Sequence, residues 1–233
     1  MWPFTKHITI ESSHFFAGFV DCHSHILPGV DDGVRHIDES LEILERYEEM
    51  GLRGVWFTPH IMEDIPNTTS DLRERFEALK SSYHGRLELH LGAENMIDNL
   101  FEKRLETNDF LPMGKKGDHL LVETSYFTPP LGFYDTLEKV KSKGYFPVLA
   151  HPERYVYMSS KDYDRLKEMK IFFQLNVFSL AGYYGSPVRQ TAEYLLKKGY
   201  YNFAGTDIHS ISMLNGWPQR HISPKQLPTF GTL

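Results

Sequence analysis

Seven short apolar segments alternate along this chain with amphipathic segments of helical period. The apolar segments cover residues 19–22, 54–58, 87–93, 119–123, 146–150, 171–176 and 202–206. Helical patterns cover residues 38–50, 70–82, 132–143 and 159–170, and a last one begins at Ser186-Pro187. Short apolar runs are typical of parallel strands covered on both faces, and repeated strand–helix units predict right-handed crossovers. The chain is therefore predicted to be an α/β protein.

Capping residues mark the helix boundaries. Ser70-Asp71 is the predicted N-cap of the second helix, and Pro187 takes the first position of the last one. Gly51 and Gly199 follow the first and last helices, where a left-handed residue is common. Residues 1–17 precede the first strand as an extension, and residues 211–233 match no further strand–helix unit. The whole of residues 1–233 is thus predicted to be one domain with two irregular ends.

Potential metal ligands follow the predicted strands at the same end. In chain order they are His23 and His25, His60, Glu94, Glu123, His151, and Asp207 with His209, while Asn176 ends the sixth strand. The carboxyl ends of parallel strands converge on one point in a closed barrel but spread along a line in an open sheet. The pattern therefore favours a closed α/β barrel with its active site at the C-terminal ends of the strands.

The residue types indicate a divalent metal site. Imidazole nitrogen and carboxylate oxygen suit Zn²⁺, Mn²⁺ and Fe²⁺. Because side chains alternate along an extended chain, His23 and His25 point to the same side and can chelate one ion, and Asp207 and His209 repeat that spacing. A carboxylate such as Glu94 can bridge two ions about 3.5–4 Å apart, which suits phosphoryl displacement. The chain is predicted to be a metal-dependent hydrolase.

Composition argues against several other classes. The formal net charge of -6 does not favour binding to nucleic acid or to an anionic membrane. No segment has the length of a membrane span or the pattern of a signal peptide, so a soluble cytoplasmic protein is expected. The single cysteine, Cys22, is followed six positions later by Pro28, where a cysteine-dependent phosphatase needs a phosphate-binding arginine. Cys22 is therefore interpreted as a buried strand residue.

The opening motif resembles that of a known superfamily. The run Asp21-Cys22-His23-Ser24-His25, followed at residues 27–33 by Leu-Pro-Gly-Val-Asp-Asp-Gly, is similar to the first motif of the PHP (polymerase and histidinol phosphatase) superfamily. It is most similar to the bacterial manganese-dependent tyrosine phosphatases of capsule and exopolysaccharide synthesis. Residues 58–60, 92–94, 151–154 and 205–209 follow in the order of that group's later motifs.

This resemblance implies a distorted (β/α)7 TIM-like barrel, the PHP fold, that holds three divalent ions, with Mn²⁺ expected first and Fe or Zn as alternatives. The implied ligands are His23, His25, Glu94 and Asp207 for the first ion, Glu94, Glu123 and His151 for the second, and Asp32, His60 and His209 for the third. Arg154 would bind the substrate phosphate. Asp207 and His209 are the other residues expected to take part in catalysis.

The resemblance also implies that the chain hydrolyses phosphotyrosine in a protein. The expected substrate is the tail of a bacterial tyrosine autokinase that controls capsule or exopolysaccharide synthesis, and this kinase would hold the enzyme at the inner face of the membrane. A metal-activated water is expected to attack phosphorus while Arg154 stabilises charge on the phosphoryl oxygens. Whether the chain forms a homo-oligomer is left open.

Several alternatives stay open at this point. The same metals would serve a phosphatase for a histidinol-phosphate-like compound or a sugar phosphate, and a metal-stabilised barrel would bind phosphopeptides without turnover. A binuclear amidohydrolase is disfavoured, because it needs a bridging Lys and a His where Glu123 and Asn176 stand. The aromatic loops around Tyr126-Phe127 and Tyr183-Tyr184 either clasp a phenyl ring or peptide, or only pack the rim.

Overall fold

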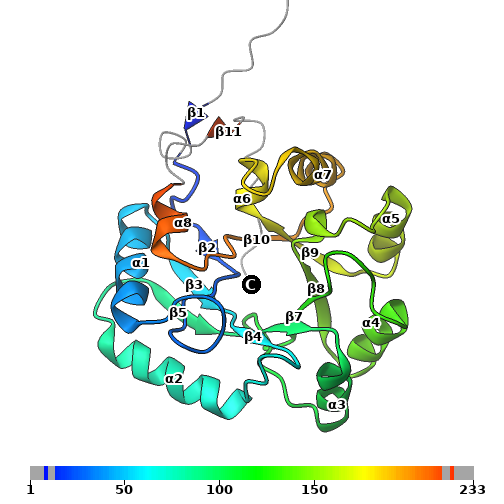
Figure 1. Cartoon of the computed structure of the whole chain (residues 1–233), viewed down its shortest axis with the longest axis horizontal. Helices are drawn as coiled ribbons and strands as arrows, with labels where there is room; N and C mark the ends of the chain where they lie inside the picture. Colours follow the sequence, from blue (N-terminus) through cyan, green and yellow to red (C-terminus); the bar gives the residue numbers. More distant parts are fainter. Residues whose placement is uncertain (1–7, 10–13, 217–220, 223–233) are drawn as a thin grey trace, which may run out of the picture.

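The strands of the computed structural model form two parallel sheets, and the structure describes residues 8–9, 14–216 and 221–222. The larger sheet has the order β10 (Phe203–Gly205), β9 (Phe172–Asn176), β8 (Phe146–Ala150), β7 (His119–Glu123), β6 (Glu94–Met96) and β4 (His60–Ile61). The smaller sheet has the order β2 (Val20–Asp21), β3 (Gly54–Phe57) and β5 (Glu88–Leu91). All neighbours within both sheets run parallel, which confirms the α/β prediction. Figure 1 shows the strands around a common centre, with the larger sheet curled as a half-barrel.

Hydrogen bonds join the edges of the two sheets. The backbone N–H of Cys22 donates to the carbonyl oxygen of Ala204 at 3.3 Å, and that of His25 donates to Ile208 at 2.9 Å. On the other side of the ring, β3 and β4 follow each other along one run of chain, and so do β5 and β6. Each of these runs thus contributes to both sheets, so the carboxyl ends of all the strands face the same centre.

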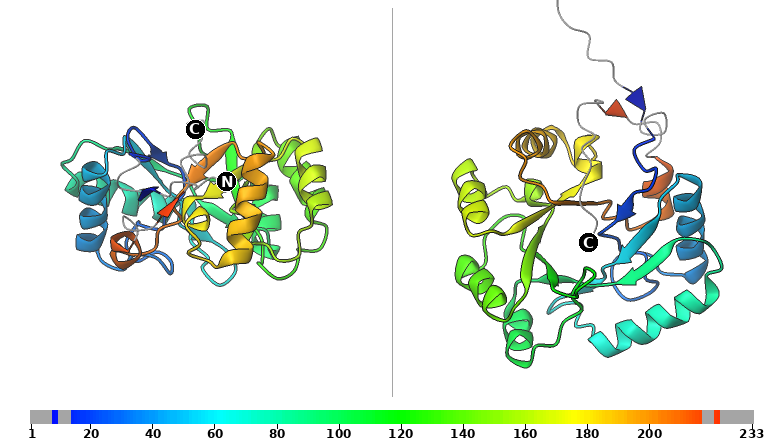
Figure 2. Two further views of the ribbon diagram at one scale, coloured as in Figure 1. Left: turned by 90° about the horizontal axis from the view of Figure 1, so that it is seen from above. Right: turned by 180° about the vertical axis from the view of Figure 1, so that it is seen from behind.

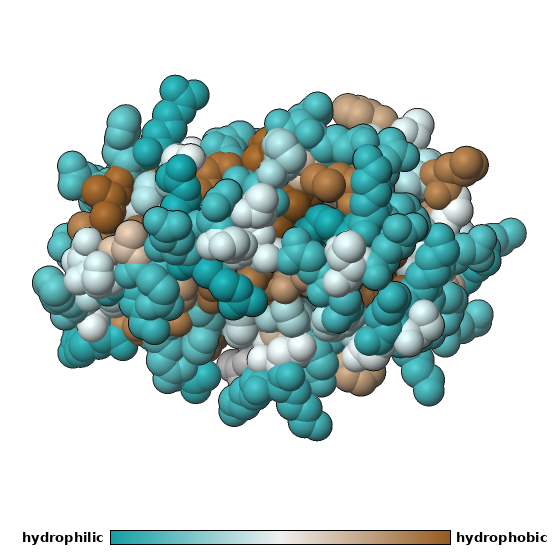
Figure 3. Space-filling view, turned by 90° about the horizontal axis from the view of Figure 1, so that it is seen from below, coloured by the Kyte–Doolittle hydropathy of each residue, from teal (hydrophilic) through white to brown (hydrophobic). Residues whose placement is uncertain are grey.

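Helices cover the outside of the sheets (Figures 1 and 2). They are α1 (Ile37–Glu49), α2 (Thr69–Ser82), α3 (Asn99–Thr107), α4 (Phe133–Ser142), α5 (Ser160–Glu168) and α7 (Ser186–Lys197). In α1 the fully buried apolar side chains are Ile43, Leu44 and Tyr47, whose spacing places them on the stripe that faces the sheet. The side of the molecule that carries α2 and α3 is mostly hydrophilic, as Figure 3 shows.

The centre of the ring is filled by a separate group of apolar side chains. This group consists of Val20, Cys22, Trp56, Met113, Leu121, Val148, Ala150 and Phe203. Cys22 is buried there, as predicted, and its Sγ donates to the carbonyl oxygen of Ala204. The ring is therefore a packed core below the strand ends, where the candidate ligands gather.

Some predicted boundaries are wrong. Helix α2 begins at Thr69, and its N-cap is Thr68, whose hydroxyl accepts a hydrogen bond from the backbone N–H of Asp71 at 3.1 Å; Ser70 lies inside the helix. Both Thr and Ser are favoured N-cap residues, and Ser somewhat more so, which explains why the sequence pattern favoured the wrong one of two neighbouring candidates. Helix α3 and the short helices α6 (Val177–Leu180) and α8 (Ile211–Asn215) were not predicted.

The predicted strand at residues 87–93 is shorter in the structure, and a further, unpredicted strand follows it. Strand β5 ends at Leu91 and β6 begins at Glu94, and Gly92 stands between them. A Cβ atom on Gly92 would lie 2.6 Å from Met113 Cγ, so the chain passes closely beneath the Met113 side chain. Met113 pairs with His119 in an isolated antiparallel bridge. The segment around Met113 thus lies beside the gap between β5 and β6.

The two predicted irregular ends meet. Strand β1 (Ile8–Thr9), within the predicted extension 1–17, pairs antiparallel with β11 (His221–Ile222), within the predicted tail 211–233. Helix α8 gives the tail a further regular segment. The rest of these two ends lies outside the described residues. Among the residues that the structure describes, no helix is both long and apolar enough to cross a membrane.

Candidate metal centre

The predicted ligands come together at the carboxyl ends of the strands. His23 and His25 follow β2, His60 opens β4, and Glu94 opens β6. The others, from the following strands, are Glu123 at the end of β7, His151 after β8, and Asp207 and His209 after β10. Parallel strands in a curled sheet bring these ends to one point, so residues separated by up to 186 positions can share a ligand set.

Four buried side chains form the first group: His23, His25, Glu94 and Asp207. The Nε2 atoms of His23 and His25 lie 3.1 Å apart. His23 Nε2 is 3.1 Å from Glu94 Oε2, and His25 Nε2 is 3.2 Å from Asp207 Oδ1. The geometry brings together the same four residues as the implied first ligand set, with both rings on one side of the chain.

Glu94 also belongs to a second group with His60 and Glu123. His60 Nδ1 lies 3.2 Å from Glu94 Oε2 and 3.0 Å from Glu123 Oε1. His151, which the resemblance placed in this set, has its Nε2 atom 3.0 Å from Glu94 Oε1 but 4.0 Å from the nearer oxygen of Glu123. Four side chains, those of His60, Glu94, Glu123 and His151, therefore lie together where the resemblance implies the second ion. His60 is the one that the resemblance did not assign to that ion.

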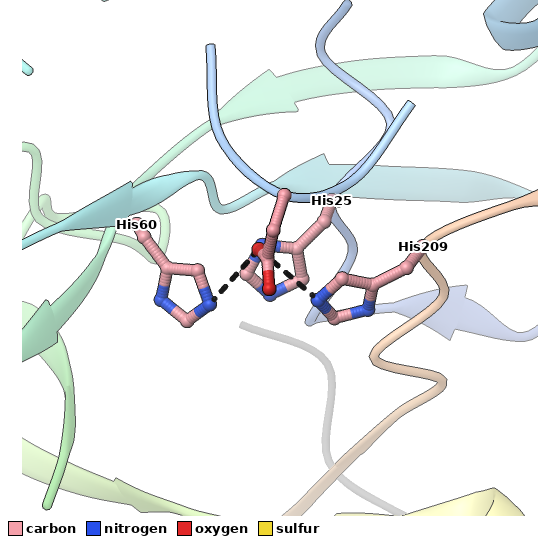
Figure 4. Close-up of side chains that lie close together, drawn as sticks. His25, His60 and His209 are labelled. Atoms are coloured by element: carbon pink, nitrogen blue, oxygen red, sulfur yellow. Dashed lines mark ion pairs between the residues drawn. The ribbon is translucent and has the colours of Figure 1, made fainter. Parts of the chain in front are cut away.

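The third group is the most accessible one and consists of His25, Asp32, His60 and His209. The Nε2 atoms of His60 and His209 each lie 3.6 Å from Asp32 Oδ1. Figure 4 shows the rings of His25, His60 and His209 turned toward one another. The side chain of Asp32 is 65% exposed, whereas the residues of the first group are buried, so this side of the centre opens to solvent.

Hydrogen bonds from outside the three groups orient the two histidines of the first motif. His23 Nδ1 donates to Gln174 Oε1 at 3.0 Å, and His25 Nδ1 donates to Asp31 Oδ2 at 2.8 Å. With Nδ1 carrying the hydrogen, each Nε2 presents a lone pair to the centre, which is the usual device for orienting a ligand histidine. Sequence reasoning assigned no role to Gln174 or Asp31. Gln174 is polar within an apolar strand, two residues before Asn176, and this was the available signal.

Below the centre, a buried carboxylate ties the first strand to the last. Asp21 accepts hydrogen bonds from Tyr47 Oη at 2.7 Å, Thr206 Oγ1 at 2.6 Å and the backbone N–H of Thr206 at 2.8 Å. This network fixes the register of residues 21 and 206. Because His23 and Asp207 lie just beyond these residues, the same network sets the spacing between two ligands of the first group.

The pKa shifts of the candidate ligands indicate that the centre favours bound positive charge. Burial alone would lower the pKa of His23, but Glu94 and Asp207 outweigh it and raise that pKa to about 9. Burial would raise the pKa of Glu94, yet the neighbouring histidines hold it well below its ordinary value. The buried atoms His60 Nδ1 and Glu94 Oε2 have no hydrogen-bond partner among the described residues. Such converging lone pairs and carboxylates fit divalent ions bound by nitrogen and oxygen.

Two of the candidate ligand residues have an unusual backbone conformation. His151 has φ 31° and Asp207 has φ 54°, both in the left-handed region that residues with a Cβ rarely adopt. In each case a strand has just ended and the chain turns sharply at the centre. Strained conformations of this kind cluster at functional sites, where the surrounding structure holds them in place.

Arg154 lies beside the first group. It ends the short 3-10 helix η2 (Pro152–Arg154), and its Nη1 donates to Asp207 Oδ2 at 2.6 Å. Its guanidinium carbon stands 4.4 Å from the centre of the Tyr126 ring and 4.3 Å from that of Tyr184, so two aromatic rings contact it. Burial would lower the pKa of Arg154, but Asp207 raises it above its ordinary value, and the group stays charged. A fixed guanidinium next to a metal centre is suited to bind a phosphate.

Comparison with known proteins shows which family the chain is similar to. The family model described as capsular polysaccharide synthesis, CpsB/CapC, matches residues 19–216. Tyrosine-protein phosphatase YwqE of Bacillus subtilis is 27% identical over 202 residues, which are 84% of this chain and 79% of YwqE. Tyrosine-protein phosphatase CpsB of Streptococcus agalactiae is 27% identical over 214 residues, 83% of this chain and 84% of CpsB.

A solved structure is also similar. It comes from work on YwqE from Bacillus subtilis and CpsB from Streptococcus pneumoniae, described as unique metal-dependent tyrosine phosphatases. The superposition has a TM-score of 0.75 with 25% sequence identity and covers 90% of this chain and 84% of the other.

Proposed function

The chain belongs to the CpsB/CapC family of capsular polysaccharide synthesis, and from this membership we propose that it is a metal-dependent tyrosine-protein phosphatase. The resemblance noted from the opening motif is thereby confirmed at the level of the family. The observation that carries the proposal is the position of Arg154, a charged guanidinium held 2.6 Å from a carboxylate of the first ligand group. A phosphate bound by Arg154 lies directly beside the metal centre.

The proposal includes three divalent ions, with Mn²⁺ first and Fe or Zn as alternatives. His23, His25, Glu94 and Asp207 would hold the first, Glu94, Glu123 and His151 the second, and Asp32, His60 and His209 the third. The short distances from His60 Nδ1 to Glu94 and Glu123 would also let His60 serve as a ligand of the second ion. When bound, the ions supply an activated water nucleophile and neutralise the phosphoryl oxygens.

The proposed fold is a distorted (β/α)7 barrel formed by one domain over residues 1–233. The hydrogen bonds from Cys22 to Ala204 in β10 and from His25 to Ile208 just beyond β10 support closure of the ring. Closure has a functional consequence, because it directs all the strand ends to one centre. The breaks at residues 58–59 and 92–93 account for the distortion.

The chain's own residues would bind and orient the phosphate. Arg154 would donate to the equatorial phosphoryl oxygens, where charge grows in the transition state. The rings of Tyr126 and Tyr184 both contact its guanidinium, which restricts the orientations that the group can take before the phosphate binds. The phenolate leaving group has a pKa near 10 and departs with little help from an acid. His209 lies on the open side of the centre, where its Nε2 can pass a proton to the leaving oxygen if it is not held by an ion.

The proposed substrate is a phosphotyrosine protein, with the tail of a bacterial tyrosine kinase as the first candidate. The relatives YwqE and CpsB are named tyrosine-protein phosphatases, which supports a phosphotyrosine protein as the substrate class. Association with the membrane through that kinase and homo-oligomerisation stay predictions.

Turnover by the purified chain tests this function. After removal of metal with a chelator, activity on a phosphotyrosine peptide is expected to be lost and to return with Mn²⁺. A sugar phosphate and histidinol phosphate, assayed in parallel, are expected to react much more slowly. Rapid hydrolysis of either small molecule with no turnover of the peptide would contradict the proposal, and binding of the peptide without phosphate release would favour a binding module.

A further inference from the structure

The loops on one side of the metal centre carry no charged residue. Residues 124–132 follow β7, residues 155–159 follow η2, and residues 177–186 follow β9, and none of these stretches contains Asp, Glu, Lys or Arg. All three leave the carboxyl ends of their strands, so they lie on the face that holds the candidate ligands. Because 24% of the whole chain is charged, several charged residues would be expected in these three stretches together.

Large apolar side chains are exposed on these loops. Phe127 is 74% exposed, Leu131 is 102% exposed and Val156 is 72% exposed. We call these three residues the apolar rim. Single exposed apolar residues are common, but three on two adjoining loops beside an active site are a typical feature of an interaction surface.

The apolar rim is continuous with Arg154. The backbone N–H of Val156 donates to the carbonyl oxygen of Tyr126 at 2.9 Å, which ties the two loops together. Tyr126 in turn contacts the guanidinium of Arg154, and Phe127 is its direct neighbour in the chain. A peptide whose phosphate is held at Arg154 therefore has the apolar rim within reach of its next residues, since an extended chain advances about 3.3 Å per residue.

The opposite side of the centre has a different character. Residues 29–32 and 64–67 line a hollow of about 560 Å³. Asp31, Asp32 and Asp64 are among its lining residues. A substrate that lay on this side would meet the exposed carboxylate of Asp64, which favours basic residues, whereas the apolar rim selects for apolar ones.

We propose that the apolar rim binds the residues that flank phosphotyrosine in the substrate protein, and that these flanking residues are apolar. This inference rests on the proposed phosphatase function and adds the side from which the substrate approaches. Burial of a Phe127-sized side chain against an apolar residue changes binding by about tenfold, which is large enough to set a sequence preference.

Kinetics with paired substrates test the proposal. Phe127→Ser and Val156→Ser are measured separately and together, and Asp64→Asn is the control on the opposite side. The substrates are free O-phospho-L-tyrosine and phosphotyrosine peptides whose two residues on each side are leucine, lysine or aspartate. The wild type is expected to prefer the leucine peptide, and the double variant is expected to lose about tenfold in kcat/KM on that peptide alone.

The outcomes separate this proposal from the function on which it rests. Hydrolysis of free phosphotyrosine by wild type and double variant at equal rates, together with the loss on the leucine peptide, supports it. Equal kcat/KM of wild type and double variant on the leucine peptide overturns it, and so does a preference for the lysine peptide that Asp64→Asn removes. A double variant that changes only the oligomeric state or binding to lipid vesicles also overturns it. Failure of the wild type on every phosphotyrosine substrate contradicts the proposed function instead.

Discussion

His25 Nδ1 lies 2.8 Å from Asp31 Oδ2, and this pair turns the Nε2 atom of the ring toward Glu94 and Asp207. The same carboxylate accepts hydrogen bonds from the backbone N–H groups of Gly33 and His60, each at 3.0 Å. One buried aspartate thereby positions two candidate ligands that come from different strands. Carboxylate–histidine pairs of this kind are known to raise metal affinity by about 10–100-fold.

Asp31→Asn is expected to weaken metal binding. The amide keeps the size of the side chain but removes the negative charge that holds the hydrogen on His25 Nδ1, so affinity for Mn²⁺ should fall by about 10–100-fold. Titration of the metal-free protein against a competing chelator measures this directly. Asp38→Asn, at an exposed position in the first turn of α1, is the control and should bind Mn²⁺ as the wild type does. Equal affinities in the two variants would remove the role given to Asp31.

Arg154→Ala is expected to lower kcat/KM for a phosphotyrosine peptide by about 100-fold or more, because a donor to the transition-state oxygens is lost. Arg154→Lys keeps the charge but not the planar two-armed donor, so it should recover only part of this loss. The matched control is Arg189→Ala, at a surface position where the guanidinium pairs with Glu193. Metal content, measured on each variant, should stay unchanged; a loss of metal in Arg154→Ala would instead assign Arg154 to holding Asp207 in place.

Much of the fold could be predicted from sequence, because each predicted strand is followed directly by a potential metal ligand or another polar residue that marks where the strand ends. The bounds of β7 and β8 agree with the prediction, since both are continuous apolar runs closed by a polar residue. The break at Gly92 could not be predicted, because its cause is Met113, a residue far along the chain that packs against it. Helix α3 begins at Asn99, and its N-cap is Asp98, whose side chain accepts a hydrogen bond from the backbone N–H of Phe101. Asp98 was therefore an available capping signal in the sequence.

The ligands themselves were accessible to sequence reasoning, because spacing and residue type suffice for them. The orientation of their side chains could not be predicted from spacing and residue type. Gln174 on β9 reaches His23 past β10, where Gly205 has no side chain to separate the two, and nothing in the local sequence shows this relation. The position of His60 between two groups likewise depends on which ring nitrogen faces which carboxylate, and that is a tertiary property.

Gly205→Ala is expected to destabilise the protein and disturb His23. A Cβ atom at residue 205 would lie 2.5 Å from His23 Cβ and 2.7 Å from its backbone nitrogen, so one of the two strands must shift. The free energy of unfolding should fall by about 1–3 kcal/mol, as is usual for overpacking, and Mn²⁺ affinity should fall with it. Gly216→Ala is the matched control, because its Cβ would meet nothing closer than 3.8 Å. Denaturant unfolding of both variants checks the prediction, which fails if both unfold alike.

Cys22→Ser is expected to leave activity within about threefold of the wild type. The buried thiol donates to the carbonyl oxygen of Ala204, and a serine hydroxyl can make the same bond. Burial also raises the pKa of the Cys22 thiol well above its ordinary value, so little thiolate exists to act as a nucleophile. Treatment of the native wild type with iodoacetamide should therefore not inhibit it. Complete loss of activity in Cys22→Ser, with the fold intact by circular dichroism, would reinstate cysteine chemistry.

Lys167 is expected to make the protein more stable as the pH rises from about 8 toward 10.5. Its ammonium is partly buried and donates to the carbonyl oxygens of Ile171 and Tyr200 and to Asn202 Oδ1, with no carboxylate among these partners. Burial therefore lowers its pKa from 10.5 in the unfolded chain to about 8 in the folded one. Between these values the unfolded state binds more protons than the folded state, so the free energy of unfolding rises with pH across this window and levels off on either side. Unfolding near pH 9 should take up about one proton more in the wild type than in Lys167→Met, which removes the titrating group. Denaturant melts of both proteins from pH 7 to 10.5 measure the difference, and parallel curves over that range would show that Lys167 keeps its ordinary pKa.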